Sequence, residues 1–290
     1  MSLLSIPLKL WRAVAVAALM IVTPAVGAQS TPGAAPVFTI GVLPNVSARV
    51  ILANYQPVRE YFERELKRKV EIATAADFPA FNAATMRGDY QLVVTAANVG
   101  RVNQIDGKWE PVAIYEPPIP GLLVAGAANA KSAVEQVKGK SLALANPQSL
   151  VALVGLKWLH EQGLQPERDF KITRAGNDDS LGALIRSGEA PLAIMSMGEF
   201  RQINEETRKV LKIVTEFAKV PGFWLLVNPK MSAADKQRVQ ALLLQLPKTE
   251  HGQKFFTLSG FRNIREISAA EQKPLDEFLE QTRAGLGPAK

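Results

Sequence analysis

The chain has 290 residues, no cysteine and a formal net charge of +7. The absence of cysteine excludes a disulfide framework and an anchor built on a lipid-modified cysteine. The lysine and arginine residues are scattered, and no basic stripe is interleaved with aromatic residues, so we expect no nucleic-acid partner.

The first 28 residues are typical of a secretory signal peptide. Lys9 and Arg12 provide a positive start, an apolar run follows, and small residues end at Ala28, the predicted cleavage point. The apolar run covers about 10 residues, which is short of the roughly 20 needed to span a bilayer. We therefore expect an exported, periplasmic protein, and an uncleaved amino-terminal anchor is the alternative. Residues 29–36 are polar and proline-containing, which predicts a flexible leader.

From Val37 onward, short apolar runs alternate with segments of helical periodicity. The strand-like runs are 38–43, 70–75, 92–95, 109–116, 121–127, 141–145, 170–175, 192–195, 211–217 and 223–229. The predicted helices are 55–66, 78–86, 97–105, 132–137, 149–161, 178–187, 198–204, 233–246, 250–258 and 269–282. This alternation predicts an α/β fold with largely parallel sheets and flanking helices.

The mature chain of about 260 residues is long for one core and favours two lobes. The runs 121–127 and 223–229 have no amphipathic helix directly before them. We expect them to be paired crossovers that form a hinge between the lobes. Residues 37–125 and 222–290 would then form lobe 1, and residues 126–221 would form lobe 2.

The stretch LALANPQSLVALVGLKWL (142–159) places a proline and a serine where a strand passes into a helix. Pro147 cannot continue a central ladder, but it fits the end of a strand. Ser149 is a good N-cap for the helix that follows. The free amides of the first helical turn, with the positive end of the helix dipole, can hold an anion. Ser149 therefore has two possible roles, to cap its own helix or to contact an anion.

Four segments, taken in order, resemble the phosphate/phosphite/phosphonate-type solute-binding proteins of ABC importers. They are YQPVREYFERELKRKVEI (55–72), TAADFPAFNAATMRGDYQLVV (74–94), LANPQSLVALVGLKWL (144–159) and AGNDDSLGALIRSGEAPLAI (175–194). The resemblance covers roughly residues 38–265. It implies a two-lobed type II periplasmic binding protein fold, a non-enzymatic role and a small, anionic ligand.

The ligand candidates combine positions from this resemblance with positions at strand ends. They are Asn45, Phe78, Thr95, Asn98, Ser149, Asn177, Met197 and Phe223. Asn45 and Met197 are included because ligands gather beyond the ends of strands in open α/β sheets. Asn98 either caps the helix at 99–105 or faces the cleft. Asn177 stands where the family has a histidine.

The resemblance also reveals departures at the ligand positions. Phe78 stands where the family often has a tyrosine, and Leu150 and Val151 replace two hydroxyl residues of a Ser-Thr-Ser element. Pro191 and Phe223 occupy places that can hold an acidic residue. Charged hydrogen bonds contribute roughly 1.5–3 kcal/mol each, so these losses would weaken phosphonate binding by several powers of ten. We therefore expect a larger or less polar organic anion.

We expect a monomeric receptor that closes on its ligand and presents it to a membrane ABC permease. A sensor that signals to another envelope protein is a second hypothesis, and an enzyme on the same fold, such as a transferase, is a third. His160 and His251 are the only histidines and have no ligand or acid-base spacing around them. We therefore predict no catalytic residue, no metal site and no cofactor.

Overall fold

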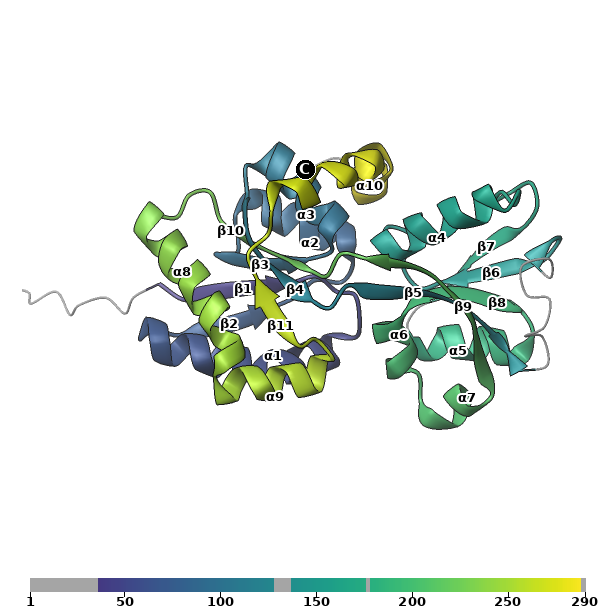
Figure 1. The fold of residues 1–290 in the computed structure, drawn as a ribbon, viewed down its shortest axis with the longest axis horizontal. Coiled ribbons are helices and arrows are strands. Elements are labelled where there is room, and N and C mark those ends of the chain that lie inside the picture. The colour runs from purple at the N-terminus through teal and green to yellow at the C-terminus, as the bar shows by residue number, and fades with distance from the viewer. Residues whose placement is uncertain (1–35, 128–136, 176–177, 288–290) are drawn as a thin grey trace, which may run out of the picture. The chain divides into compact units, whose positions relative to one another are not determined.

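The computed structural model describes residues 36–127, 137–175 and 178–287 (Figure 1). These residues fall in one unit of the chain, 35–290. The predicted signal peptide lies outside them, as do nearly all of the predicted leader and of the predicted helix 132–137. Of the ligand candidates, Asn177 lies outside the described residues.

The first sheet has six strands in the order β11-β4-β10-β3-β1-β2. Its strands are β1 (Phe38–Val42), β2 (Val70–Ala73), β3 (Leu92–Thr95), β4 (Glu110–Glu116), β10 (Trp224–Val227) and β11 (Asn263–Arg265). Strand β1 pairs in parallel with β2 and β3, whereas β10 pairs antiparallel with β3 and β4, and β11 pairs antiparallel with β4.

Helices cover both faces of the first sheet. They are α1 (Ala48–Leu66), α2 (Phe78–Arg87), α3 (Ala97–Gly107), α8 (Ala233–Gln245) and α9 (Glu250–Ser259). Successive side chains of a strand point to opposite faces. In β10, Trp224 and Leu226 accordingly pack with α2 and α3, while Leu225 packs with α1, α8 and α9.

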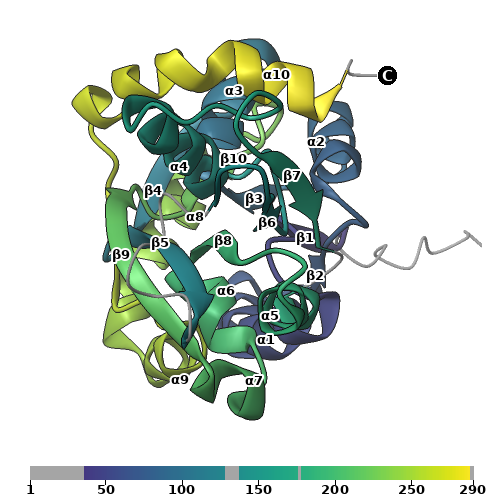
Figure 2. The same ribbon diagram turned by 90° about the vertical axis from the view of Figure 1, so that its right-hand side faces the viewer.

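The second sheet has five strands in the order β7-β6-β8-β5-β9. Its strands are β5 (Ile119–Gly126), β6 (Ser141–Leu144), β7 (Lys171–Arg174), β8 (Leu192–Ser196) and β9 (Leu211–Val220). Its helices are α4 (Leu150–Glu161), α5 (Asp178–Ser187), α6 (Met197–Gln202) and α7 (Glu205–Lys209). Helix α4 lies on one face and α5 and α6 on the other (Figure 2).

Both sheets are mixed, whereas the alternation predicted largely parallel sheets. The reason is the way in which the chain passes between them. Residues 117–118 lead from β4 into β5, and residues 221–223 lead from β9 back to β10. Because β5 enters the second sheet and β9 leaves it alongside, the two strands run in opposite directions.

These two connections come just before the runs that were predicted as crossovers. Most of 121–127 is β5 and most of 223–229 is β10, so each run belongs to one sheet. The second connection lies against the end of β4, since the Tyr115 amide donates to the Phe223 carbonyl at 3.0 Å. The predicted lobe limits and the hinge stay predictions.

Two helices differ from the predicted ranges for local reasons. Helix α1 begins at Ala48 rather than Tyr55, because the Ser47 hydroxyl accepts a hydrogen bond from the Val50 amide at 3.4 Å and caps it. The predicted helix 269–282 is instead η4 (Ala269–Glu271), η5 (Lys273–Phe278) and α10 (Leu279–Leu286). Pro274 is the second residue of η5, and a proline cannot donate a helical hydrogen bond. Strand β11 and helix α7 were not predicted.

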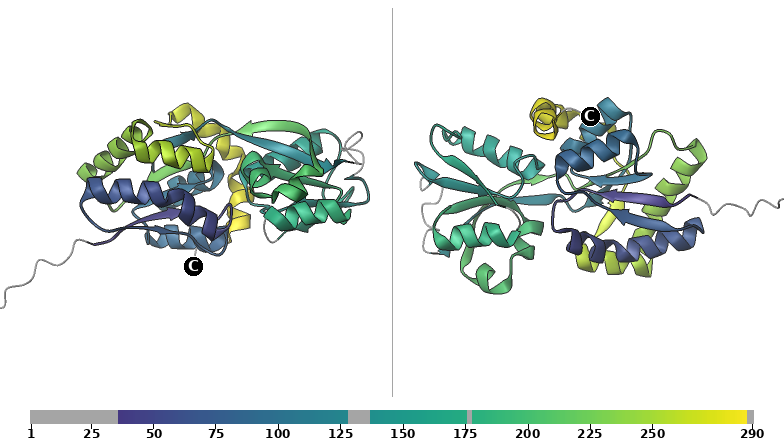
Figure 3. Two further views of the ribbon diagram at one scale, coloured as in Figure 1. Left: turned by 90° about the horizontal axis from the view of Figure 1, so that it is seen from below. Right: turned by 180° about the vertical axis from the view of Figure 1, so that it is seen from behind.

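The carboxy-terminal segment, η5 and α10, joins helices that belong to different sheets. It packs on α3, where Arg101 pairs with Asp276 at 2.7 Å. It also reaches α4, where Lys157 pairs with Glu277. Figure 3 shows this segment from behind, as the yellow ribbon above the place where the two groups of strands join.

Within the part of the chain that the structure describes, no helix combines the length and the apolar character needed to cross a membrane.

Candidate functional site

Two adjoining cavities lie between the two sheets, and both take their walls from both sheets. The inner pocket has a volume of about 50 Å³ and is lined by residues that include Phe78, Ala97, Ser149, Leu150, Val151 and Glu199. The outer cleft has a volume of about 400 Å³ and is lined by residues that include Asn54, Tyr55, Met197, Arg201, Lys219 and Arg262. Asn45, Ile119, Ser196 and Phe223 line both cavities.

Ser149 caps helix α4 in the structure and also lines the inner pocket. Its hydroxyl oxygen accepts a hydrogen bond from the Ala152 amide at 3.1 Å. The neighbouring Leu150 and Val151 are buried and line the same pocket. The capping role is therefore observed, and the anion contact of Ser149 stays a prediction.

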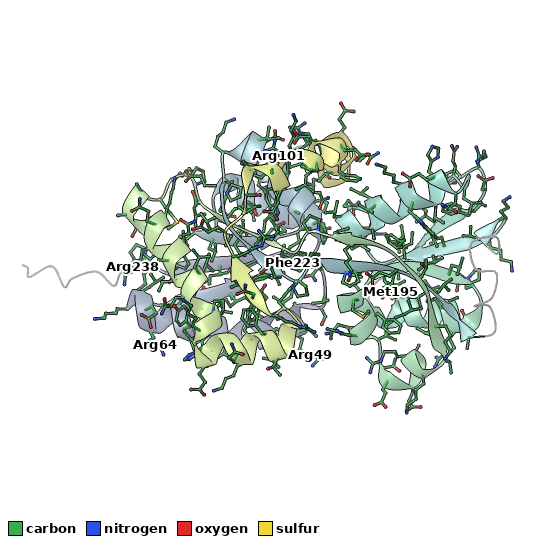
Figure 4. The ribbon with its side chains drawn as sticks, in the orientation of Figure 1. Arg49, Arg64, Arg101, Met195, Phe223 and Arg238 are labelled. Atoms are coloured by element: carbon green, nitrogen blue, oxygen red, sulfur yellow. The ribbon has the colours of Figure 1, made fainter. Side chains whose placement is uncertain are left out.

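Two aromatic candidates lie at the pocket. Phe78 starts helix α2, which Asp77 caps by accepting a hydrogen bond from the Ala80 amide at 2.8 Å. The Phe78 side chain is buried against the inner pocket. Phe223 belongs to the second connection and sits at the junction between the sheets (Figure 4). Its ring packs edge-on against Phe261, with centroids 5.9 Å apart.

Thr95 and Asn98 line neither cavity, although Ala96 and Ala97 between them line the inner pocket. Thr95 is the last residue of β3, lies opposite Trp224 of β10 and is fully buried. Asn98 lies inside the first turn of α3, where the carboxy-terminal segment covers it. Its side-chain amide nitrogen, Nδ2, donates to the Gln148 carbonyl at 3.1 Å and to the Thr282 hydroxyl at 3.0 Å. Asn98 is also not the cap of α3, because the N-cap position is Ala96.

The three remaining ligand candidates are Asn45, Met197 and Asn177. Asn45 lines both cavities and Met197 lines the outer cleft. Asn177 lies outside the described residues. Direct ligand contact stays a prediction for each candidate.

Glu199 is a residue of the inner pocket that the sequence analysis missed. It forms a capping box with Ser196, whose amide donates to the Glu199 carboxylate at 2.6 Å, while the Ser196 hydroxyl accepts from the Glu199 amide at 3.1 Å. Burial raises the pKa of the Glu199 carboxyl, and the hydrogen bonds from Ser196 oppose this shift. The signal was present in the sequence, since SMGE (196–199) has the Ser-x-x-Glu spacing of a capping box directly after a strand.

The raised pKa predicts how Glu199→Gln should change stability with pH. The native state holds this proton more tightly than the unfolded chain, so the contribution of Glu199 to stability falls as pH rises through its folded pKa. Glutamine keeps an acceptor for the Ser196 amide but cannot ionise. We therefore expect the variant to gain stability relative to the wild type as pH rises from 4 towards 8, roughly the range over which such carboxyls titrate.

Chemical denaturation at several pH values measures this difference. Glu266→Gln, which changes an exposed carboxyl outside both cavities, is the control for the lost charge. The prediction would be contradicted if the unfolding free energy of Glu199→Gln minus that of the wild type stayed constant or fell as pH rises.

Three cationic side chains line the outer cleft, and the sequence analysis did not single them out. Arg201 comes from α6, Lys219 from β9, and Arg262 from the chain between α9 and β11. Glu216 also lines this cleft, with its carboxylate 3.7 Å from the Lys219 amine.

Among the described residues, no group of three or more His, Cys, Asp or Glu side chains is placed to hold a metal ion.

Most of the chain matches one known protein family. Residues 40–272 match the model of the periplasmic phosphonate substrate-binding proteins of ABC transporters. The chain belongs to this family. The resemblance inferred from the four segments is thus confirmed, and so is the non-enzymatic role, because the family comprises binding components of transporters.

Solved structures confirm the two-lobed type II periplasmic binding protein fold. PhnD1 of Prochlorococcus marinus, in complex with methylphosphonate, has a TM-score of 0.76 at 13% identity, over 84% of this chain and 97% of that one. A binding component of a Pseudomonas aeruginosa ABC phosphonate transporter has a TM-score of 0.74 at 13% identity, over 87% and 89%. The periplasmic aliphatic sulphonate binding protein of Escherichia coli has a TM-score of 0.61 at 15% identity, over 84% and 92%. No curated protein sequence matches the chain significantly.

Proposed function

We propose that this member of the phosphonate-binding family binds a small organic anion in the periplasm and delivers it to an ABC permease. The observation that carries the proposal is the pair of adjoining cavities with walls from both sheets. A ligand there touches both halves of the protein at once. Closure around it is favoured if the closed state binds the ligand more tightly than the open one.

The lining of the inner pocket sets the ligand class that we propose. Phe78, Leu150 and Val151 present carbon rather than hydroxyl groups to this pocket. A phosphonate oxygen facing these three side chains would find no hydrogen-bond partner in them, which is costly in a buried site. Relatives of this fold bind methylphosphonate and aliphatic sulphonates. We therefore propose an anion that carries an apolar group.

Native mass spectrometry of protein purified without refolding, followed by a thermal-shift screen, tests the proposal. The probes are phosphate, methylphosphonate, butylphosphonate and butanesulfonate, with 1-butanol as the uncharged control. We expect the butyl anions to raise the melting temperature more than phosphate or methylphosphonate does. Complete indifference to all the anions, with nothing co-purifying, would contradict the binding role. A large shift with micromolar phosphate or methylphosphonate would contradict the ligand class.

A further inference from the structure

We propose that the anionic group of the ligand lies in the outer cleft, between Arg201 and Arg262, rather than over the first turn of α4. This inference rests on the proposed function and specifies the orientation of the ligand, that is, which of the two cavities holds its anionic group. It assigns a binding role to two arginines from different halves of the protein, and it leaves the inner pocket for the apolar part of the ligand.

The charges of the two cavities differ in sign. Among the described residues, the charged side chain that lines the inner pocket is Glu199. The outer cleft is lined by the cations Arg201, Lys219 and Arg262 and by one carboxylate, Glu216, so its charged lining has a net charge of +2. An anion is therefore attracted to the outer cleft and repelled from the ionised form of Glu199.

The two arginines are free to bind an anion. Within the described part of the chain, neither the Arg201 nor the Arg262 guanidinium has a carboxylate partner, in contrast to Lys219 and Glu216. Both are exposed at the cleft. Guanidinium groups present several donors in a fixed plane, which suits the oxygens of phosphonate, sulfonate and carboxylate groups.

Arg201 extends across the cleft to Gly260. Arg201 belongs to α6 of the second sheet, but its Nη1 lies 2.6 Å from where a Cβ would stand on Gly260, at the end of α9. Arg262 follows Gly260 by two positions in the chain. An anion beside Gly260 would therefore meet cations from both halves of the protein and would link them on binding.

The first turn of α4 is a poor place for the same anion. The side chains of Leu150 and Val151 offer no hydrogen-bond donor, and of the three residues at this turn only Ser149, which accepts from the Ala152 amide, carries a hydroxyl. The inner pocket of about 50 Å³ has room for roughly three or four water molecules, which is enough for a few carbon atoms of an alkyl group. The aromatic and aliphatic part of its wall, which includes Phe78, Leu150 and Val151, favours that kind of group.

The test is calorimetric titration of butylphosphonate into the wild type, Arg201→Gln and Arg262→Gln. Lys212→Gln is the control, because Lys212 is an exposed cation on the same strand as Lys219 but outside both cavities. Ser149→Ala reports on the first turn of α4. Circular dichroism and the melting temperature establish that each variant is folded.

We expect each arginine variant to bind about tenfold more weakly, in keeping with the loss of one charge-assisted hydrogen bond. Lys212→Gln should bind as the wild type does, and Ser149→Ala should weaken binding less than either arginine variant does. Raising the salt concentration should weaken the wild type more than either arginine variant, because exposed charges are screened.

Wild-type affinity in both arginine variants, together with a loss in Ser149→Ala, would overturn this inference and leave the proposed function standing. Failure of the wild type to bind any of the anionic probes would overturn both. The two failures are therefore distinguishable.

Discussion

Gly222→Ala is expected to lower the free energy of unfolding by about 3 kcal/mol, the upper part of the usual range for overpacking a buried site. A Cβ at this position would lie 2.0 Å from the Tyr115 carbonyl oxygen and 2.9 Å from the carbonyl carbon. Both atoms belong to backbone, so the clash cannot be relieved by rotating a side chain. The second connection and the end of β4 would have to move apart.

The effect should extend to ligand binding, because Gly222 directly precedes Phe223, which lines both cavities. Gly198→Ala is the matched control. It also lies beside the outer cleft, but its Cβ would meet only the Ser196 hydroxyl at 3.6 Å, an ordinary contact. Alanine is moreover favoured over glycine inside a helix. Urea denaturation measures both variants, and equal stability of the two would contradict the argument from close approach.

Local sequence signals were sufficient to predict much of the fold. The strand-to-helix seam at Pro147 and Ser149 was predicted correctly because a proline and an N-cap act within a few residues. The predicted and observed ranges of α5 coincide for the same kind of reason, since the apolar periodicity is local. The order of the four segments then identified the family.

Features that depend on residues far apart in the chain could not be predicted from the sequence. Gly222 is required by the Tyr115 carbonyl, which the fold brings alongside it. Asn98 is buried because α10 covers it. Arg262 reaches the cleft because α9 ends beside α6, which no local pattern encodes. Periodicity reveals which face of an element is apolar, but not which distant element will cover it.

The candidate site was predicted in part, because some of its residues occupy positions that the sequence reveals and others do not. Asn45, Phe78, Ser149, Met197 and Phe223 line the cavities, and all lie at or near the ends of strands or the starts of helices. Strand ends are recognisable from the sequence, and the fold class places them at the cleft. The charge of the cleft is a property of several separate segments, so it emerged only with the structure.

Asn98→Asp is expected to destabilise the protein by about 3–5 kcal/mol at neutral pH, the range observed when a buried charge is left without a partner. The Asn98 side chain is 1% exposed, and its amide donates to the Gln148 carbonyl and the Thr282 hydroxyl. A carboxylate in the same place would face the Gln148 carbonyl oxygen with another oxygen. Contacts among α3, the turn before α4 and α10 would all be weakened.

The dependence on pH separates this mechanism from a simple loss of packing. Burial should raise the pKa of the introduced carboxyl above its unfolded value of about 3.9. The native state then holds the proton more tightly than the unfolded chain, so stability is greatest at low pH and is lost as pH rises through the folded pKa. Once protonated, the carboxyl can donate to the Gln148 carbonyl, as Asn98 does.

Asn98→Ala supplies the comparison, because it removes the same donor without adding a titratable group. We expect it to cost about 1–3 kcal/mol, the penalty for leaving buried partners unsatisfied, and to do so equally at each pH. Chemical denaturation of both variants between about pH 4.5 and 8 gives the two profiles, over the range in which a buried carboxyl titrates. If the Asn98→Asp deficit stayed constant across that range, the side chain would have access to water. The bridge from α3 to α4 and α10 would then be open in solution rather than buried.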